Sequence, residues 1–130
     1  LLTIILQISM KTMSQENTII NGDWVLDSMI VNDTVLIPEY SNFYLKVNDT
    51  SLEYSIGANY CWARIQLSKN KIFNKDGLAC TEVGGDQLFG DYYKYLSYFG
   101  NYYIKELTKQ LVITNEKITH YLRRKATKLE

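Results

Sequence analysis

The sequence predicts an α+β fold that is mostly β: a strongly curved antiparallel sheet or partial barrel with one amphipathic helix packed on it. Two patterns predict this class. Most segments between residues 22 and 122 alternate apolar and polar side chains, which is typical of strands that bury one face. One stretch, about residues 86–99, instead repeats its apolar side chains at the helical period, so one side of a helix would pack on the sheet.

The expected strands follow one another along the chain. The first, residues 24–31, places Trp24 and Leu26 on its apolar face. The clearest hairpin joins residues 43–47 to residues 52–56, because apolar and polar residues alternate on both sides of a short polar turn. The other expected strands cover residues 35–37, 60–67, 71–73, 78–80, 102–107, 110–113 and 117–122.

The expected helix begins at Asp86, whose carboxylate accepts hydrogen bonds from the free amides of the first turn and suits the positive end of the helix dipole. It ends at Gly100-Asn101, since both residue types tolerate the left-handed conformation of a C-terminal cap. Its apolar side would face the sheet. The side chains that define this predicted fold are Trp24, Leu26, Ala79, Phe89 and Leu96.

Length and charge limit the classes of protein that the chain can form. A chain of 130 residues with 46% apolar residues is long enough for one domain with a core and too short for two. Its 14 acidic and 14 basic residues cancel, which disfavours nucleic acid as a partner. We expect a monomer without a stable membrane span, whose partner is an unknown protein or a small ligand.

The N-terminal segment, residues 1–20, is expected to lie outside the domain. Residues 1–8 form an apolar run of the length of a signal-peptide core, too short to span a bilayer. One interpretation is a signal-peptide remnant cleaved after Thr12-Met13-Ser14, which favours export to the periplasm or cell envelope. The alternatives are a disordered or extra segment, or a start at Met10 in the cytoplasm. The domain would then cover residues 21–124, with a basic tail at 125–130.

The two cysteines, Cys61 and Cys80, lie nineteen positions apart and show no metal-ligand spacing. Cys61 falls on the buried face of its strand, and an antiparallel neighbour would bring Cys80 close to it. In an exported protein a disulfide between them would stabilise the fold by about 3 kcal/mol. In the cytosol the same residues would be buried thiols.

Several short elements resemble the META-domain (HslJ-like) family. They are Trp24 and Leu26 in an early strand, Pro38 before Phe43, Gly57 and Asn59 before Cys61, Ala79-Cys80 before the helix, and Leu111 and Ile113 in a closing strand. The resemblance covers about residues 20 to 124 and marks the chain as a divergent member. It implies a small antiparallel sheet around one helix, found often in exported or envelope proteins of bacteria, with no established enzymatic activity.

A second resemblance concerns the lipocalin-like pattern, in which a tryptophan under a barrel meets an arginine late in the chain. Gly22-Asp23-Trp24 and either Arg123 or Arg124 are similar to that pattern. It implies a carrier with an apolar cavity for a small molecule. The expected helix favours the META-like fold, because lipocalins usually place their helix after the main barrel strands, whereas here three strands would follow it.

No catalytic residue, metal site or cofactor motif emerges from the sequence. His120 is the only histidine, and its alternation with Ile118 and Leu122 predicts a core residue rather than a base or ligand. A possible interaction surface consists of Tyr93, Tyr98, Tyr102, Tyr103 and Trp62, since tyrosine gives large contact area at low entropic cost. The alternative places the tyrosine rings in the core with their hydroxyls at its rim.

These observations predict a non-enzymatic, exported, envelope-associated domain that binds a partner through its surface. The alternative is a lipocalin-like carrier of a small apolar ligand.

Overall fold

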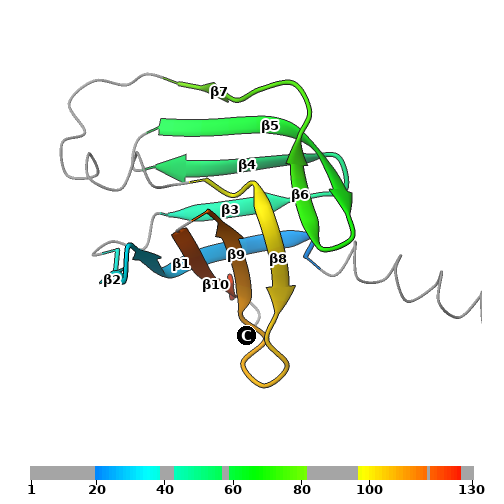
Figure 1. Ribbon diagram of the computed structural model, residues 1–130. Helices are drawn as coiled ribbons and strands as arrows, with labels where there is room; N and C mark the ends of the chain where they lie inside the picture. Colours follow the sequence, from blue (N-terminus) through cyan, green and yellow to red (C-terminus); the bar gives the residue numbers. More distant parts are fainter. Residues whose placement is uncertain (1–19, 39–42, 57–58, 82–96, 117, 127–130) are drawn as a thin grey trace, which may run out of the picture.

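The computed structural model describes residues 20–38, 43–56, 59–81, 97–116 and 118–126 (Figure 1). These residues form β-strands joined by turns and loops. The strands are β1 (Gly22–Val31), β2 (Thr34–Leu36), β3 (Tyr44–Val47), β4 (Ser51–Ile56), β5 (Asn59–Ser68), β6 (Lys71–Asn74), β7 (Ala79–Cys80), β8 (Gly100–Ile104), β9 (Leu111–Asn115) and β10 (Ile118–Arg124).

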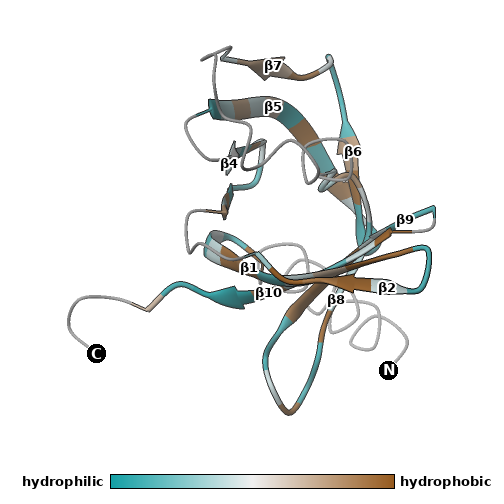
Figure 2. Cartoon of the chain, turned by 90° about the vertical axis from the view of Figure 1, so that its left-hand side faces the viewer, coloured by the Kyte–Doolittle hydropathy of each residue, from teal (hydrophilic) through white to brown (hydrophobic). Residues whose placement is uncertain are grey.

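Eight of these strands form a closed antiparallel barrel. Around the ring the order is β1, β3, β4, β5, β6, β8, β9 and β10, and β10 then pairs with β1. The closing pair runs from Trp24 opposite Arg124 to Val31 opposite Ile118, with a register shift between Leu26 and Ser28. Closure leaves no long unpaired edge in the ring, which removes the usual template for aggregation. Figure 2 shows β4 and β5 on the opposite side of the interior from β1 and β10.

Strands β2 and β7 lie outside this ring. β2 pairs with residues Met29–Val31 of β1, while the first part of the same edge of β1 pairs with β3. β5 likewise divides one edge between two partners, because β6 pairs with Ile65–Ser68 and β7 pairs with Cys61–Trp62. The two long strands, β1 and β5, therefore each hold three neighbours.

Alternation of side chains fills the interior and leaves a separate outer face. On β5, Cys61, Ala63 and Ile65 are buried, while Tyr60 before them and Trp62 between them are exposed. The other strands of the ring also direct apolar side chains into the interior. The largest fully buried side chains are Trp24, Tyr98, Phe43, Ile20, Met29, Leu45, Leu52, Ile72, Leu111, Ile113, Leu122 and His120.

Two tight turns and one glycine fix the connections between strands. Asn32-Asp33 and Lys69-Asn70 both have positive φ, which is the requirement for two-residue hairpin turns that match the twist of the strands. Gly100 begins β8 with φ 153°. A Cβ atom there would lie 2.2 Å from the carbonyl oxygen of Thr114, so no larger residue fits between β8 and β9.

The expected strands agree with the observed ones, including the hairpin of β3 and β4 and the three strands near the C-terminus. The predicted fold class is wrong, because the strands close into a barrel and no described residue is helical. Residues 86–96 of the expected helix lie outside the described residues, and its last part, residues 97–99, is non-helical and leads into β8.

The position of Tyr98 gives the physical reason for this correction. The helical pattern places Tyr98 on the solvent side, whereas the structure buries it completely in the barrel. Tyr102, which also points inward, is in the same period-two phase. This end of the predicted helix therefore follows the alternation of the β-strands, and the pairing of β1 with β10 supplies the closure that local periodicity does not encode.

Candidate functional site

The first and last strands of the barrel meet at a buried tryptophan. The guanidinium carbon of Arg124 lies 4.2 Å from the centre of the Trp24 ring, and its Nη1 donates a hydrogen bond to the Asn21 carbonyl oxygen at 2.7 Å. Trp24 Nε1 donates to the Ile20 carbonyl oxygen at 2.8 Å. Gly22 leaves room for the arginine, since a Cβ there would lie 2.7 Å from Nη1. Of the two late arginines, Arg124 is therefore the one that contacts Trp24.

Inside the barrel, three polar aromatic side chains lie together. Tyr54 comes from β4, Tyr98 from the segment before β8, and His120 from β10, and all three are buried. The Tyr98 ring meets Tyr54 edge-on, with centroids 5.0 Å apart, and lies 5.1 Å from His120 at a tilt of 51°. His120 Nδ1 is 3.2 Å from the Ile113 carbonyl oxygen, which orients its ring. We refer to Tyr54, Tyr98 and His120 as the interior polar cluster.

The Tyr98 hydroxyl is the chemically unusual member of this cluster. It is buried and has no hydrogen-bond partner among the residues that the structure describes. Leaving such a group unsatisfied costs about 1–3 kcal/mol, so buried hydroxyls normally have a partner. Burial raises the pKa of Tyr54 to about 12 and also raises the pKa of Tyr98, with a smaller contribution from charge on Tyr54. At neutral pH both phenols are therefore protonated, and Tyr98 can donate a hydrogen bond to a ligand.

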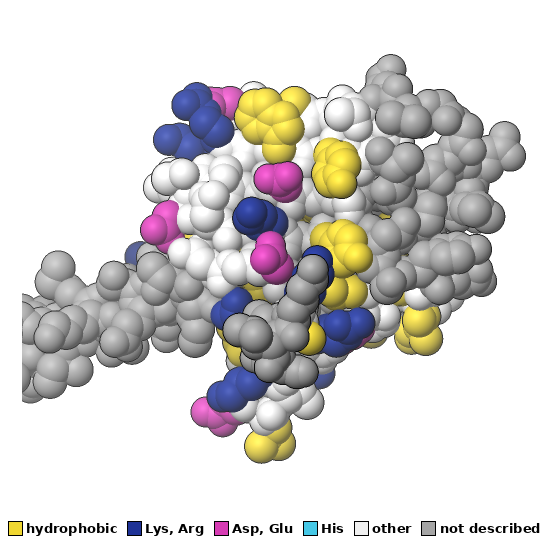
Figure 3. Space-filling model, turned by 180° about the vertical axis from the view of Figure 1, so that it is seen from behind, with side chains coloured by type: hydrophobic (Ala, Val, Ile, Leu, Met, Phe, Trp, Pro, Cys, Tyr) yellow, Lys and Arg dark blue, Asp and Glu magenta, His cyan; other side chains and the backbone are white. Residues whose placement is uncertain are grey.

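The outer face of β3, β4 and β5 carries a second group of aromatic side chains. Tyr44, Tyr60 and Trp62 have exposed fractions of 37%, 56% and 57%. Figure 3 shows apolar side chains in a line on this side of the molecule, with charged side chains beside them. We refer to Tyr44, Tyr60 and Trp62 as the outer aromatic face.

Two hollows lie along this face. One has a volume of about 180 Å³ and is lined by Tyr44, Tyr60, the small side chain of Ser55, and four charged side chains. The other, about 460 Å³, lies between Trp62 and the segment 76–79. The aromatic side chains therefore border concave surface rather than a flat sheet.

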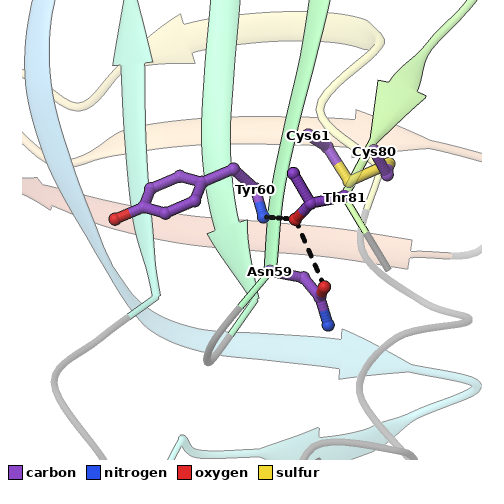
Figure 4. Close-up of a disulfide and its surroundings, with 5 residues drawn as sticks. All are labelled: Asn59, Tyr60, Cys61, Cys80 and Thr81. Atoms are coloured by element: carbon purple, nitrogen blue, oxygen red, sulfur yellow. Dashed lines mark hydrogen bonds between the residues drawn. A yellow bond between two sulfur atoms is a disulfide. The ribbon is translucent and has the colours of Figure 1, made fainter. Parts of the chain in front are cut away.

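A disulfide between Cys61 and Cys80 attaches β7 to β5 (Figure 4). The two residues are directly opposite in register, and their Cα atoms are 4.1 Å apart. Thr81 extends this attachment, because its hydroxyl accepts a hydrogen bond from the Tyr60 amide and donates one to Asn59 Oδ1, at 2.9 and 3.2 Å. The expected disulfide is confirmed.

The residues predicted to form an interaction surface are distributed differently by the fold. Trp62 and Tyr103 are exposed, but they lie on β5 and β8, with β6 between these strands. Tyr98 and Tyr102 are buried inside the barrel. Tyr93 lies outside the described residues.

The other predicted positions fall partly in the core. Trp24 and Leu26 are buried, as expected, and His120 is a buried core residue, as its alternation predicts. Ala79 is exposed on β7. Phe89 and Leu96 lie outside the described part of the chain.

Tyr44, Tyr54 and Tyr60 are not among the site residues that the sequence predicts. A signal for two of them exists, because Tyr44 and Tyr60 stand at the polar positions of alternating strands and so must face outward. Nothing in the local sequence brings Tyr54 next to Tyr98 and His120, since that contact depends on the closure of the barrel.

Comparison with known proteins gives a fold relationship. No family model and no curated protein sequence matches the chain. Among solved structures, the NMR structure of a protein from Burkholderia xenovorans is similar, with a TM-score of 0.65 and 16% sequence identity over 82% of this chain and 83% of that chain. At this identity the similarity concerns the fold alone, and the META-like resemblance stays a prediction.

The described residues contain neither a metal-binding cluster nor a membrane-spanning helix. Among them, no group of three or more His, Cys, Asp and Glu side chains is placed to hold a metal ion. The same part of the chain contains no helix that is long and apolar enough to cross a membrane.

Proposed function

We propose that the protein is a non-enzymatic, lipocalin-like carrier that holds one small, largely apolar ligand inside its barrel. The observation that carries this proposal is the Tyr98 hydroxyl, a buried donor that has no partner among the described residues and lies in a mostly apolar interior. Ligand pockets combine apolar walls with a few placed polar groups, and the interior polar cluster has that composition.

The architecture supports the same class. An eight-stranded barrel has an interior that side chains can fill or that can hold one small ligand, so the ligand must be small. The stacking of Arg124 on Trp24 matches the lipocalin-like pattern at the point where the barrel closes. Both features favour a carrier over an enzyme.

The chemistry of the cluster defines which ligand fits. A protonated phenol offers one hydrogen to an acceptor such as a carbonyl or ether oxygen. The surrounding side chains are mostly apolar, and the same burial that raises the pKa values of Tyr54 and Tyr98 makes a charged ligand unfavourable there. We therefore expect a neutral ligand with an apolar body and one hydrogen-bond acceptor.

A matched pair of ligands tests this proposal. Cyclohexanone and methylenecyclohexane have the same shape, but only cyclohexanone carries an acceptor. In methyl-detected NMR titrations we expect cyclohexanone to shift interior resonances such as those of Leu111 and Leu122, and to bind roughly fivefold more tightly than the hydrocarbon, because one hydrogen bond contributes about 1 kcal/mol. Tyr98→Phe should abolish this preference.

Tyr103→Phe is the matched control, because Tyr103 is an exposed tyrosine on β8. It should leave the preference unchanged. The Tyr98→Phe protein should be at least as stable as the wild type, since the substitution removes an unsatisfied hydroxyl. Absence of interior shifts with both ligands, or an unchanged preference in Tyr98→Phe, would reject the carrier.

We also propose that the protein works in an oxidising compartment, the periplasm or cell envelope. The Cys61–Cys80 disulfide supports this location, because such bonds persist in exported proteins and are rare in the cytosol. The outer aromatic face is the specific feature that favours a second function, the binding of a partner at the surface.

A further inference from the structure

We propose that the outer aromatic face is a second binding site, separate from the barrel interior, and that it takes a neutral oligosaccharide. The argument rests on the arrangement of aromatic and polar side chains on β3, β4 and β5, and on the two hollows beside them.

The strand register places two tyrosines on either side of a small residue. Ser55 lies opposite Tyr60 on β5, and on its other side its hydroxyl accepts a hydrogen bond from the Tyr44 amide at 3.1 Å. Two strand spacings, about 10 Å, therefore separate the backbones that carry the two tyrosines. This separation is close to the length of one disaccharide unit, and Ser55 forms the floor between them.

A parallel row of residues supplies polar groups and a third ring. Across β1, β3, β4 and β5 the opposed residues are Asp23, Lys46, Glu53 and Trp62. Trp62 stands two residues from Tyr60 on the same side of β5, so the two rings lie about 7 Å apart along the strand. The two tyrosines of the first row therefore lie beside the charged groups of the second, which ends in a ring of its own.

This arrangement, with aromatic rings beside hydrogen-bonding groups, suits the binding of a sugar chain better than the binding of a protein. The C–H groups of a pyranose form an apolar face that packs on an aromatic ring, while its hydroxyls bind charged and amide groups at the edge. A stable protein interface instead needs a contiguous apolar centre from which charged residues are depleted. Here Lys46 and Glu53 stand beside the aromatic residues.

The balance of charge narrows the ligand further. The acidic residues on and beside the face are Asp23, Glu53 and Asp76, and the basic ones are Lys46, Arg64 and Lys125. Arg64 and Asp76 form an ion pair, and Lys125 Nζ lies 4.6 Å from the centre of the Tyr44 ring. Charges of both signs are therefore distributed over the surface. A polyanion such as nucleic acid or a sulfated glycan needs an excess of positive charge, so a neutral chain is favoured.

Isothermal titration with cellopentaose, xylopentaose and chitopentaose tests the proposal. We expect at least one of them to bind. Trp62→Ala and Tyr60→Ala should each weaken that binding roughly tenfold, because a lost stacking contact costs about 1.4 kcal/mol. Tyr103→Ala and Phe73→Ala are matched controls with exposed rings, 52% and 44%, outside this face, and both should bind as the wild type does.

The site is rejected if none of the three pentasaccharides binds at millimolar concentration, or if Trp62→Ala and Tyr60→Ala retain full binding. It is also rejected if sedimentation shows a dimer that Trp62→Ala dissociates, because the face would then serve a second copy of the chain. Tyr98→Phe should leave oligosaccharide binding unchanged, so failure of the interior carrier and failure of this site are separate results.

Discussion

At the scale of single residues, the buried Tyr98 hydroxyl combines a stability cost with a chemical role. A carrier that keeps an unsatisfied donor in its apolar interior is less stable than one with phenylalanine at that position. The two ring contacts, to Tyr54 and His120, hold the phenol in place without satisfying its hydroxyl. A group of this kind is expected where a ligand replaces the missing partner.

The same phenols predict how stability depends on alkaline pH. The folded-state pKa of Tyr54 is raised to about 12, and that of Tyr98 is raised as well, from an unfolded value of about 10. Below pH 10 both are protonated in either state. Above it the unfolded chain loses these protons first, so the free energy of unfolding should fall by about 1.4 kcal/mol per pH unit for each phenol between about pH 10 and 12.

Urea denaturation at several pH values measures this effect. Tyr98→Phe removes one of the two phenols whose pKa is raised and should make the alkaline decline shallower, whereas Tyr103→Phe should not, because Tyr103 is exposed. Equal slopes for wild type and Tyr98→Phe would contradict the interior position of the ionisable group.

Residue-level prediction from the sequence succeeded where alternation decides the outcome. Trp24, Leu26 and His120 are buried as their strand phase indicates. It failed for Tyr98, because an aromatic-rich segment fits helical and extended periods about equally well. It also missed Tyr44 and Tyr60, because these residues share one face only when β3, β4 and β5 lie side by side.

At the scale of elements, β7 depends on one covalent bond and a few hydrogen bonds. It is two residues long, and the disulfide joins it to Cys61 near the start of β5. The hydroxyl of Thr81 adds one side-chain bond to Tyr60 and one to Asn59. Removing the disulfide should therefore loosen this segment without changing the ring.

Replacement of Cys61 and Cys80 together by alanine should lower the free energy of unfolding by about 3 kcal/mol, the chain-entropy value for a loop of this length. Urea denaturation with and without reductant measures it. Reduced wild type should match the double variant, and the double variant should not respond to reductant. A wild type with equal stability in both redox states would show that the bond constrains nothing.

The strands were predictable as elements because each carries its own alternation and ends at a polar turn. The turns at residues 32–33 and 69–70 are also readable, since Asn and Asp tolerate positive φ. The pairing of β1 with β10 was not predictable, because no local sequence pattern indicates which strand pairs with the first one. The tryptophan and the late arginine were visible in the sequence, but the expected helix favoured the META-like fold over the lipocalin-like one.

At the scale of the whole molecule, Arg124 lies where the first and last strands of the barrel pair. This residue stacks on Trp24 and binds the Asn21 carbonyl, and so joins the two ends of the domain. The neighbouring Arg123 instead forms an ion pair with Asp27 at 2.9 Å on the surface. The two arginines offer a direct comparison between a closing contact and a surface contact.

Arg124→Ala should lower the free energy of unfolding by about 1–3 kcal/mol, because it removes a cation–π contact and a charged hydrogen bond that are both weakened by the exposure of Arg124. Arg123→Ala should cost less than about 1 kcal/mol, as for other exposed ion pairs. In a Trp62→Phe background Trp24 is the sole tryptophan of the chain, and only Arg124→Ala should shift its fluorescence to longer wavelength. Equal effects of the two arginines would contradict a special role for Arg124.

The closure also sets the order in which the chain can fold. Arg124 and Asn21 are 103 positions apart, so β10 must be complete before the second edge of β1 acquires its partner. Contacts across such a distance form slowly, because the loop entropy is lost before the contact is gained. During synthesis one edge of β1 stays open until β10 leaves the ribosome. We therefore expect the nascent chain to need protection from strand-to-strand association until β10 is made.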